Sequence, residues 1–188
     1  MSLLVLVRHG ESYGNRDASH WSDPSTNFLT LEGVEHAQMA GELLAVEGIR
    51  FDAVMSSKIL RAQQTARYII DTIAADHNQE QLVCHEWLNE REHYPEMEEL
   101  QVVRYRVMHG IQEYVIPLLK EDLNVLLVSH YFTIREILAA ICGVSTTGEN
   151  RYRVLHGQPI CIHFDHEFKT DYTTLGDQDK FYHHGKNT

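Results

Sequence analysis

Residues 3–12 read LLVLVRHGES, and every further interpretation of the chain starts from this stretch. The unbroken aliphatic run over residues 3–7 predicts a strand that is buried on both faces, as in a parallel sheet. Arg8, His9 and Gly10 follow at its carboxyl end, where open α/β sheets bind their ligands. Gly10 would let the backbone approach a ligand without a Cβ atom in the way. A guanidinium, an imidazole and backbone amides at one point are typical of a phosphate site.

The composition is that of a globular protein in water. The chain has 188 residues, 43% of them hydrophobic and 23% charged, which predicts a single domain over residues 1–188. Its formal net charge of −11 argues against a nucleic-acid partner, because phosphate backbones bind basic surfaces. No stretch approaches membrane-spanning length, and the first apolar run is too short for a signal peptide. We therefore expect a cytoplasmic protein with no membrane partner, and the sequence favours no particular oligomeric state.

Neither a disulfide framework nor a metal site is indicated. The three cysteines are odd in number and contain no Cys-x-x-Cys pair, so we expect reduced thiols in the core: Cys84, Cys142 and Cys161. Histidines near the end of the chain, two of them flanking Asp165, do not form a tetrahedral ligand set. They are interpreted as surface residues: His163, His166, His183 and His184. We accordingly expect neither a metal ion nor a cofactor.

Hydrophobic periodicity predicts strands that alternate with helices. Further strands are expected over Phe51–Met55, Leu82–His85, Asn124–Ser129 and, as a last strand at the sheet edge, Gln158–Asp165. Helices are expected from Thr30 to about Val46, from Ser56 or Ser57 to about Ile73, over Leu100–Leu119 with a kink or end at Pro117, and from about Ile134 to Gly143. This alternation predicts an α/β fold, a three-layer α/β/α sandwich with a mainly parallel sheet.

Four segments between or after these elements are polar. Tyr13–Phe28 predicts a loop over the end of the first strand, and Pro95 forbids a regular helix interior in the acidic segment 86–99. Residues 170–188 predict a partly disordered tail. The run GVSTTGE at 143–149 approaches a phosphate-binding P-loop, but its final glutamate stands where that motif has lysine and would repel phosphate. We interpret this run as a helix-ending loop.

Three predicted strands end in residues that suit phosphoryl transfer. Arg8 and His9 follow the first strand, Arg61 lies in the first helical turn after the second, and His130 follows the strand over Asn124–Ser129. Because the carboxyl ends of parallel strands meet at one edge of a sheet, we expect these side chains to lie close together. Two histidines and two arginines without a metal-ligand set favour transfer of a phosphoryl group through a phosphohistidine.

The sequence resembles the histidine phosphatase superfamily, also called the phosphoglycerate mutase-like family. The matching segments follow the family's order and span most of the chain to about residue 142: Arg8–Ser12 with Asn15, Leu29–Thr30 with Gly33, Ser56–Ala66, Leu88–Arg91, and Val128–His130 with Ile134–Arg135. The resemblance implies a phosphoglycerate mutase-like fold and a metal-independent phosphatase that hydrolyses small phosphomonoesters.

The resemblance also assigns a role to each matching residue. His9 is the nucleophile, and it must be neutral to attack, as an imidazole with a pKa near ~6.5 mostly is at neutral pH. Arg8, Arg61 and His130 hold the phosphoryl oxygens, and Asn15 donates a further hydrogen bond. Glu90 is the general acid that protonates the leaving group and then the base that activates water.

Two positions depart from the family. Tyr131 follows the second histidine, where the family usually has glycine, and we expect a compatible backbone and a ring that walls the substrate pocket. One extra residue lies in the segment 89–94, NEREHY, which resembles the acid motif of the mutases. The general acid is therefore assigned to Glu90, with Glu92 as the alternative.

Two other functions stay open at this stage. A cofactor-dependent phosphoglycerate mutase fits Leu88–Arg91, although such mutases are longer and carry basic segments where this chain is short and acidic. A non-catalytic module that binds a phosphorylated ligand or a protein on the same fold is the other alternative. The full set of site residues argues against it.

Overall fold

The computed structural model describes residues 2–21, 26–73, 82–91, 97–146 and 152–176. One six-stranded sheet has the order β3-β2-β4-β1-β5-β6. Its strands are β1 (Ser2–Arg8), β2 (Ala53–Ser57), β3 (Leu82–His85), β4 (Val125–Ser129), β5 (Pro159–Phe164) and β6 (Thr170–Thr174). The first four of the sheet order are parallel, whereas β5 runs antiparallel to both β1 and β6.

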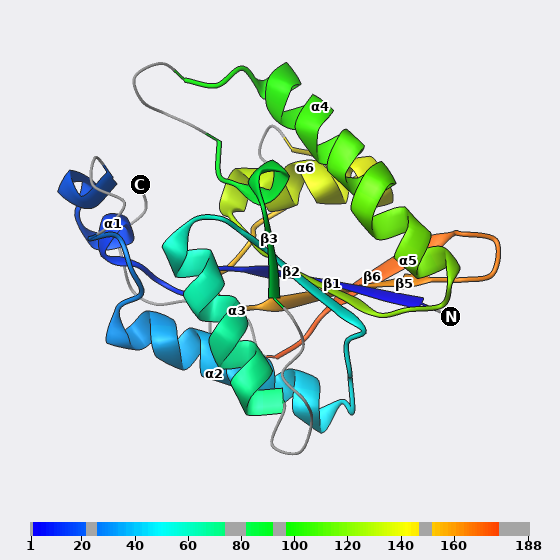
Figure 1. Ribbon diagram of the computed structural model, residues 1–188, viewed down its shortest axis with the longest axis horizontal. Helices are drawn as coiled ribbons and strands as arrows, with labels where there is room; N and C mark the ends of the chain where they lie inside the picture. Colours follow the sequence, from blue (N-terminus) through cyan, green and yellow to red (C-terminus); the bar gives the residue numbers. More distant parts are fainter. Residues whose placement is uncertain (1, 22–25, 74–81, 92–96, 147–151, 177–188) are drawn as a thin grey trace.

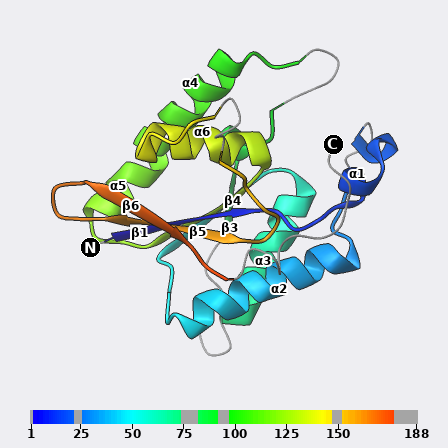
Figure 2. The same ribbon diagram turned by 180° about the vertical axis from the view of Figure 1, so that it is seen from behind.

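Helices cover both faces of this sheet. They are α1 (Tyr13–Arg16), α2 (Leu31–Val46), α3 (Leu60–Ile73), α4 (Leu100–Gly110), α5 (Ile116–Lys120) and α6 (Tyr131–Cys142), with the short 3₁₀ segments η1 (Ala18–Trp21) and η2 (Glu86–Leu88) and the π-helical segment η3 (Ile111–Val115). Figures 1 and 2 show α2 and α3 on one face and α4, α5 and α6 on the other. The predicted three-layer α/β/α sandwich with a mainly parallel sheet is confirmed.

The first strand is central to both cores. Leu4 and Leu6 pack into the core beneath α4 and α6, while Leu3, Val5 and Val7 pack into the core beneath α2 and α3. Adjacent side chains of a strand point to opposite faces, so a strand covered on both sides needs an unbroken apolar run. This is the physical reason for the aliphatic run at the start of the sequence.

Two glycines bring the end of β1 against the start of α2. A Cβ atom on Gly10 would lie 2.1 Å from the carbonyl oxygen of Gly33, and one on Gly33 would lie 1.9 Å from that of Glu11. The Thr30 side chain caps α2 by accepting a hydrogen bond from Gly33 N at 3.1 Å. The lack of a Cβ atom at Gly10 thus allows β1 to pack against α2, and the expected approach of this backbone to a ligand stays a prediction.

Several local expectations were wrong. The expected loop over Tyr13–Phe28 contains α1 and η1. The last predicted strand, β5, is internal, because the start of the expected disordered tail forms the edge strand β6. Pro117 neither ends nor simply kinks its helix: the chain widens into the π-helical segment η3 just before it and continues to Lys120. Proline cannot donate to the preceding turn and its ring crowds that turn, which a wider turn relieves.

Other expectations agree with the structure. Gly143 ends α6 with a φ of +68°, and His163 and His166 are exposed. The three cysteines are free thiols, although only Cys161 is fully buried. Among the described residues, no helix is long and apolar enough to cross a membrane. Five residues singled out in the sequence lie outside the described parts of the chain: Glu92, Pro95, Glu149, His183 and His184.

We expect Gly33→Ala to lower the free energy of unfolding by about 1–3 kcal/mol, because the added methyl group would overpack a contact between two backbones. The higher helix propensity of alanine would by itself raise the free energy of unfolding by up to about 1 kcal/mol, so the sign of the measured change separates the two effects. Urea denaturation followed by circular dichroism measures it. The control is Gln38→Ala at an exposed position of α2, with an expected change below about 0.5 kcal/mol. A Gly33→Ala variant as stable as the wild type would contradict the tight contact.

Candidate active site

The carboxyl ends of β1, β2 and β4 bring the predicted phosphate-site residues together. His9 directly follows β1 and is 2% exposed, and His130 directly follows β4 and is fully buried. Their ring centroids lie 4.9 Å apart. Arg8 is the last residue of β1, and Arg61 is the second residue of α3, which follows β2. The alignment of β1, β4 and β2 through parallel pairing is what places these side chains at one point.

Hydrogen bonds fix the tautomer of His9. Its Nδ1 lies 2.7 Å from the carbonyl oxygen of Gly10, and because a carbonyl can only accept, Nδ1 carries the proton. Its Nε2 accepts a hydrogen bond from Nε of Arg61 at 3.1 Å. The lone pair of a neutral imidazole therefore lies on Nε2. Burial, followed by the charge of Arg61, holds the pKa of His9 well below its usual value of 6.5.

His130 has the opposite arrangement of its ring nitrogens. The Ser57 hydroxyl donates to Oδ1 of Asn89 at 2.8 Å, so it accepts from the Nε2 of His130, which lies 2.9 Å away. Burial, followed by the charges of Arg61 and Arg8, lowers the pKa of His130 well below its usual value. Its Nδ1 is buried and has no hydrogen-bond partner in the described part of the chain.

The two arginines are half-buried cations. Arg8 donates from Nη1 to the carbonyl oxygen of Val154 at 3.1 Å, while its Nε is buried with no partner among the described residues. Burial lowers the pKa of Arg8 to about 10, so the side chain stays charged at neutral pH. Burial also lowers the pKa of Arg61. Unpartnered buried donors are rare in native proteins, and beside a second cation they are suited to receive an anion.

Glu90 lies beside both arginines. The negative charge of Glu90 raises the pKa of Arg8 and of Arg61, and so offsets part of the lowering that burial causes. Oε1 accepts hydrogen bonds from the backbone N–H of Arg91 at 2.9 Å and of Phe132 at 3.2 Å, and Phe132 lies in the first turn of α6. A helix N-terminus favours a carboxylate, so α6 helps to hold Glu90 at the site. The alternative residue, Glu92, lies outside the described residues.

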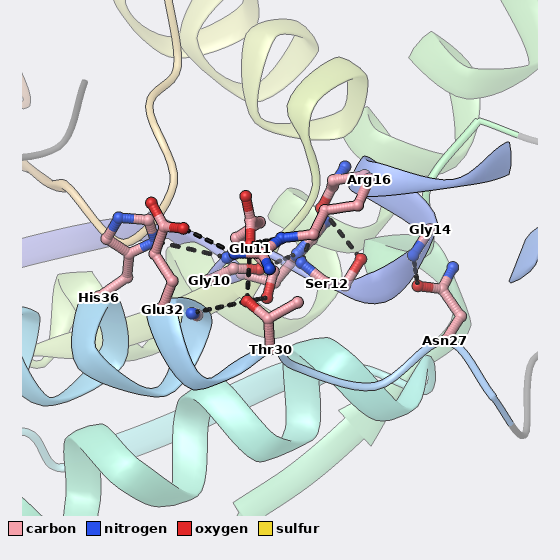
Figure 3. Close-up of polar contacts among 12 residues, drawn as sticks. Gly10, Glu11, Ser12, Gly14, Arg16, Asn27, Thr30, Glu32 and His36 are labelled. Carbon is pink, nitrogen blue, oxygen red and sulfur yellow. Dashed lines mark hydrogen bonds and ion pairs between the residues drawn. The ribbon is translucent and has the colours of Figure 1, made fainter. Parts of the chain in front are cut away.

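Asn15 is an exposed residue of α1, which follows the end of β1. The Oδ1 atom of Asn15 accepts from the backbone N–H and from the hydroxyl of Ser12, both at 2.9 Å, so the amide NH₂ is the group able to donate to a ligand. Figure 3 shows Arg16 held between Glu11 and Glu32, with contacts of 2.6 and 2.7 Å. These ion pairs tie the segment after β1 to α2.

Tyr131 fits its position without strain. It opens α6, and it is not among the residues with positive φ in the described chain. The predicted compatibility of tyrosine with this backbone is therefore confirmed. The ring centre lies 5.1 Å from the guanidinium carbon of Arg8 and 5.1 Å from that of Arg135. This cation–π contact fixes the ring directly beside a phosphate-site arginine.

Sequence reasoning missed one histidine at the site and left two supporting residues without a role. His156 lies in the segment before β5, and its Nδ1 lies 2.8 Å from the carbonyl oxygen of His9. The Thr65 hydroxyl accepts a hydrogen bond from the backbone N–H of Gly10 at 3.0 Å, and Oδ1 of Asn89 accepts one from the Ser57 hydroxyl. Thr65 and Asn89 fall within matched motifs, whereas His156 lies outside them and 147 positions from His9.

No metal centre accompanies this site within the described residues. They contain no group of three or more His, Cys, Asp or Glu side chains that could hold a metal ion. The groups that the described site offers to an anionic ligand are the guanidinium cations and the neutral imidazoles. This arrangement can hold a phosphoryl group and present a neutral nucleophile to it.

Known proteins share this sequence pattern and fold. Residues 4–83 and 71–172 match the sequence profile of the histidine phosphatase superfamily (branch 1). A 2,3-bisphosphoglycerate-dependent phosphoglycerate mutase of Parvibaculum lavamentivorans is 25% identical over 87% of this chain and 91% of its own length. A phosphoglycerate mutase of Schizosaccharomyces pombe is 26% identical over 89% of this chain and 92% of its own. The α-ribazole phosphatase from Shigella flexneri, 24% identical, shares the fold with a TM-score of 0.71, covering 94% of this chain and 96% of its own.

Burial of neutral histidines makes the stability of the fold depend on pH. His9, His130 and His156 all have a pKa lowered from 6.5, so below that pH the unfolded chain binds more protons than the folded chain. We expect the free energy of unfolding to fall between about pH 7 and 5.5, by up to about 1.4 kcal/mol per pH unit for each group.

Denaturation by urea at several pH values measures this slope. His130→Asn should make this pH dependence shallower by up to the contribution of one histidine. The control variant is His163→Asn at an exposed position, which should leave the pH dependence unchanged. A slope that His130→Asn does not alter would contradict the neutral state of His130 in the folded protein.

Proposed function

Because the chain belongs to the histidine phosphatase superfamily, we propose that it is a metal-independent phosphatase that hydrolyses small phosphomonoesters through a phosphohistidine on His9. The observation that carries the proposal is the Nε2 lone pair of a neutral His9, held 3.1 Å from the guanidinium of Arg61. The unpartnered Nε of Arg8 and Nδ1 of His130 lie in the same buried site.

In the first step the substrate phosphoryl group binds between Arg61 and His9 and replaces the hydrogen bond that joins them. Arg61 then donates to phosphoryl oxygens, and the Nε2 lone pair attacks phosphorus in line with the leaving oxygen. The N–P bond forms while the P–O bond to the leaving group breaks. Protonated Glu90 gives its proton to the departing oxygen, so that an alcohol leaves.

In the second step water attacks the phosphohistidine. The Glu90 carboxylate takes a proton from the water, a new P–O bond forms, and the N–P bond to His9 breaks. Inorganic phosphate leaves, and His9 returns to the neutral form with the proton on Nδ1. Glu90 ends in the protonated state from which the next cycle starts.

The negative charge on the equatorial phosphoryl oxygens is held by fixed donors. Arg8 and Arg61 supply forked guanidinium groups, which match phosphoryl oxygens and do not need to reorganise during transfer. A bound anion favours the protonated form of His130, whose Nδ1 then becomes a further donor. Asn15 supplies an amide donor, and the Tyr131 ring walls the space next to Arg8.

Pairing of two nearby cations, Arg16 and Arg106, supports a monoester with few further charges. A mutase substrate carries a carboxylate as well as its phosphoryl group, and a bisphosphorylated primer carries yet another anionic group. Of the cations around this site, Arg16 is paired with Glu11 and Glu32, and Arg106 with Glu98. The α-ribazole phosphatase similarity in fold agrees with hydrolysis.

Phosphate release from a panel of phosphomonoesters, with a chelator present, tests the proposal directly. The wild type should release phosphate, and His9→Ala should lower the rate by about 10³-fold or more, because the variant lacks the imidazole that forms the covalent intermediate. Acid-labile, base-stable label on the wild type after rapid quenching would identify the phosphohistidine. Hydrolysis that needs an added metal ion, or that survives in His9→Ala, would refute the proposal.

The role of Glu90 predicts a dependence on the leaving group. We expect Glu90→Gln to lower kcat by about 10²–10⁴-fold for alkyl phosphates, whose leaving alkoxide needs a proton. The loss should be far smaller for p-nitrophenyl phosphate, whose phenolate leaves without one. The matched control is Glu86→Gln, since Glu86 is in the same segment but is exposed and paired with Lys58. Equal losses on both substrates would assign the general acid elsewhere, with Glu92 as the next candidate.

A second function is favoured by the relatives that are named phosphoglycerate mutases. It predicts interconversion of monophosphoglycerates that a bisphosphoglycerate primer stimulates, with little release of free phosphate. Phosphate release without interconversion would exclude it.

A further inference from the structure

The peptide group between His9 and Gly10 is held at both of its polar atoms by side chains from distant segments. Its N–H donates to Oγ1 of Thr65 on α3 at 3.0 Å. Its carbonyl oxygen lies 2.8 Å from Nδ1 of His156. Because a carbonyl oxygen can only accept, His156 must donate, and its Nδ1 carries a proton. The plane of this peptide is therefore fixed from two sides.

The position of this peptide matters because the next carbonyl sets the state of the nucleophile. The Gly10 carbonyl oxygen accepts from Nδ1 of His9 at 2.7 Å, which places the lone pair on Nε2. A rotation of the His9–Gly10 peptide would move Gly10 and its carbonyl away from the ring. The imidazole of His9 would then lose its fixed tautomer, and its Nε2 lone pair would lose its fixed direction.

His156 is itself held firmly against the end of β1. In its segment, Gly157 N–H donates to the Arg8 carbonyl oxygen at 2.9 Å, and Val154 accepts from the Arg8 guanidinium at 3.1 Å. Gly157 has a φ of +71°, and a Cβ atom there would lie 2.7 Å from the carbonyl oxygen of His36. The rings of His36 and His156 are nearly parallel, at 4°, with centroids 6.2 Å apart.

His36 also joins this arrangement to the loop after His9. Its Nδ1 accepts from the backbone N–H of Glu11 at 3.4 Å, as Figure 3 shows beside Gly10. The segment before β5, α2 and the end of β1 thus meet around one imidazole. Such packing from three elements restricts the rotation of the His156 ring.

We infer that His156 is a positioning residue for the proposed reaction: its Nδ1–H fixes the His9–Gly10 peptide and, through it, the tautomer and direction of the nucleophile. This inference rests on the proposed function. The groups that face the His156 ring are His9, His36 and the cations Arg8 and Arg61. Burial and these cations keep the pKa of His156 well below 6.5, so the donor is the neutral imidazole throughout the neutral range.

Two variants with amide side chains distinguish the Nδ1 donor from other roles of the His156 ring. In His156→Asn the amide nitrogen can occupy the place of Nδ1, so the donor is kept and the titrating ring is lost. In His156→Gln the amide reaches the place of Nε2, so the donor to His9 is lost. His156→Leu has the branched shape of asparagine without a donor and replaces the Gln variant if that variant does not fold. His163→Asn, at an exposed position of β5, is the matched control.

We expect His156→Asn to keep kcat within about threefold of the wild type, with the same pH profile. His156→Gln should lower kcat by about 10–100-fold, as expected of a displaced reacting group, with little change in KM. Equal rates of His156→Gln and the His163→Asn control would overturn the inference. An equal loss in the Asn and Gln variants, or a shifted pH profile in the Asn variant, would also overturn it, because the ring would then act by more than its Nδ1 donor.

A second readout does not depend on turnover. Long-range ¹H–¹⁵N NMR of the histidine side chains reports the tautomer of His9, with its signals assigned by their loss in His9→Ala. The Nδ1–H tautomer should persist in His156→Asn and give way to a mixture in His156→Gln. If the wild type hydrolyses no phosphomonoester, the proposed function fails, and this spectrum still decides the positioning role. An unchanged His9 tautomer in His156→Gln would refute that role.

Discussion

The orientation of the peptide between His9 and Gly10 is the constraint on which the rest of the site depends. Its carbonyl and amide are bound to His156 and Thr65, and the carbonyl that follows holds the Nδ1 proton of His9. The proposed nucleophile needs one unprotonated nitrogen that faces the substrate, and the hydrogen bond from Nδ1 of His9 to the backbone leaves Nε2 unprotonated. The glycine contact with α2 then prevents any side chain at position 10, because a Cβ atom would meet Gly33.

The sequence was sufficient to predict where the reactive side chains meet. Arg8, His9, Arg61 and His130 all lie at or just after the ends of neighbouring parallel strands, so the strand pattern alone brings them to one edge. The buried aliphatic run of β1 determines its central place, since only a strand covered on both faces requires it. Local patterns thus predict the position of a site when its residues lie at or just after the ends of strands.

The rest of the arrangement arises from contacts that no local pattern records. His156 reaches His9 because β5 pairs antiparallel with β1, so the segment before β5 lies beside the end of β1. The position of β5 inside the sheet follows in turn from β6, whose polar residues show no clear period. Composition and spacing do not contain this information.

The charges of the site oppose the stability of the empty fold. Arg8 and Arg61 are half-buried and close together, and the three neighbouring imidazoles stay neutral because burial and these cations lower the pKa of each. Protonation of any of these imidazoles would add a third positive charge, which a low-dielectric surrounding makes unfavourable.

A bound phosphoryl group reverses this balance. It neutralises the arginines and makes a protonated His130 favourable, so the ligand stabilises the folded chain in proportion to its concentration relative to its dissociation constant. In a chain with a net charge of −11, these local cations attract an anion against the overall charge of the protein. We therefore expect the two guanidinium groups to favour a phosphoryl dianion over a singly charged anion, because their attraction grows with the charge of the ligand.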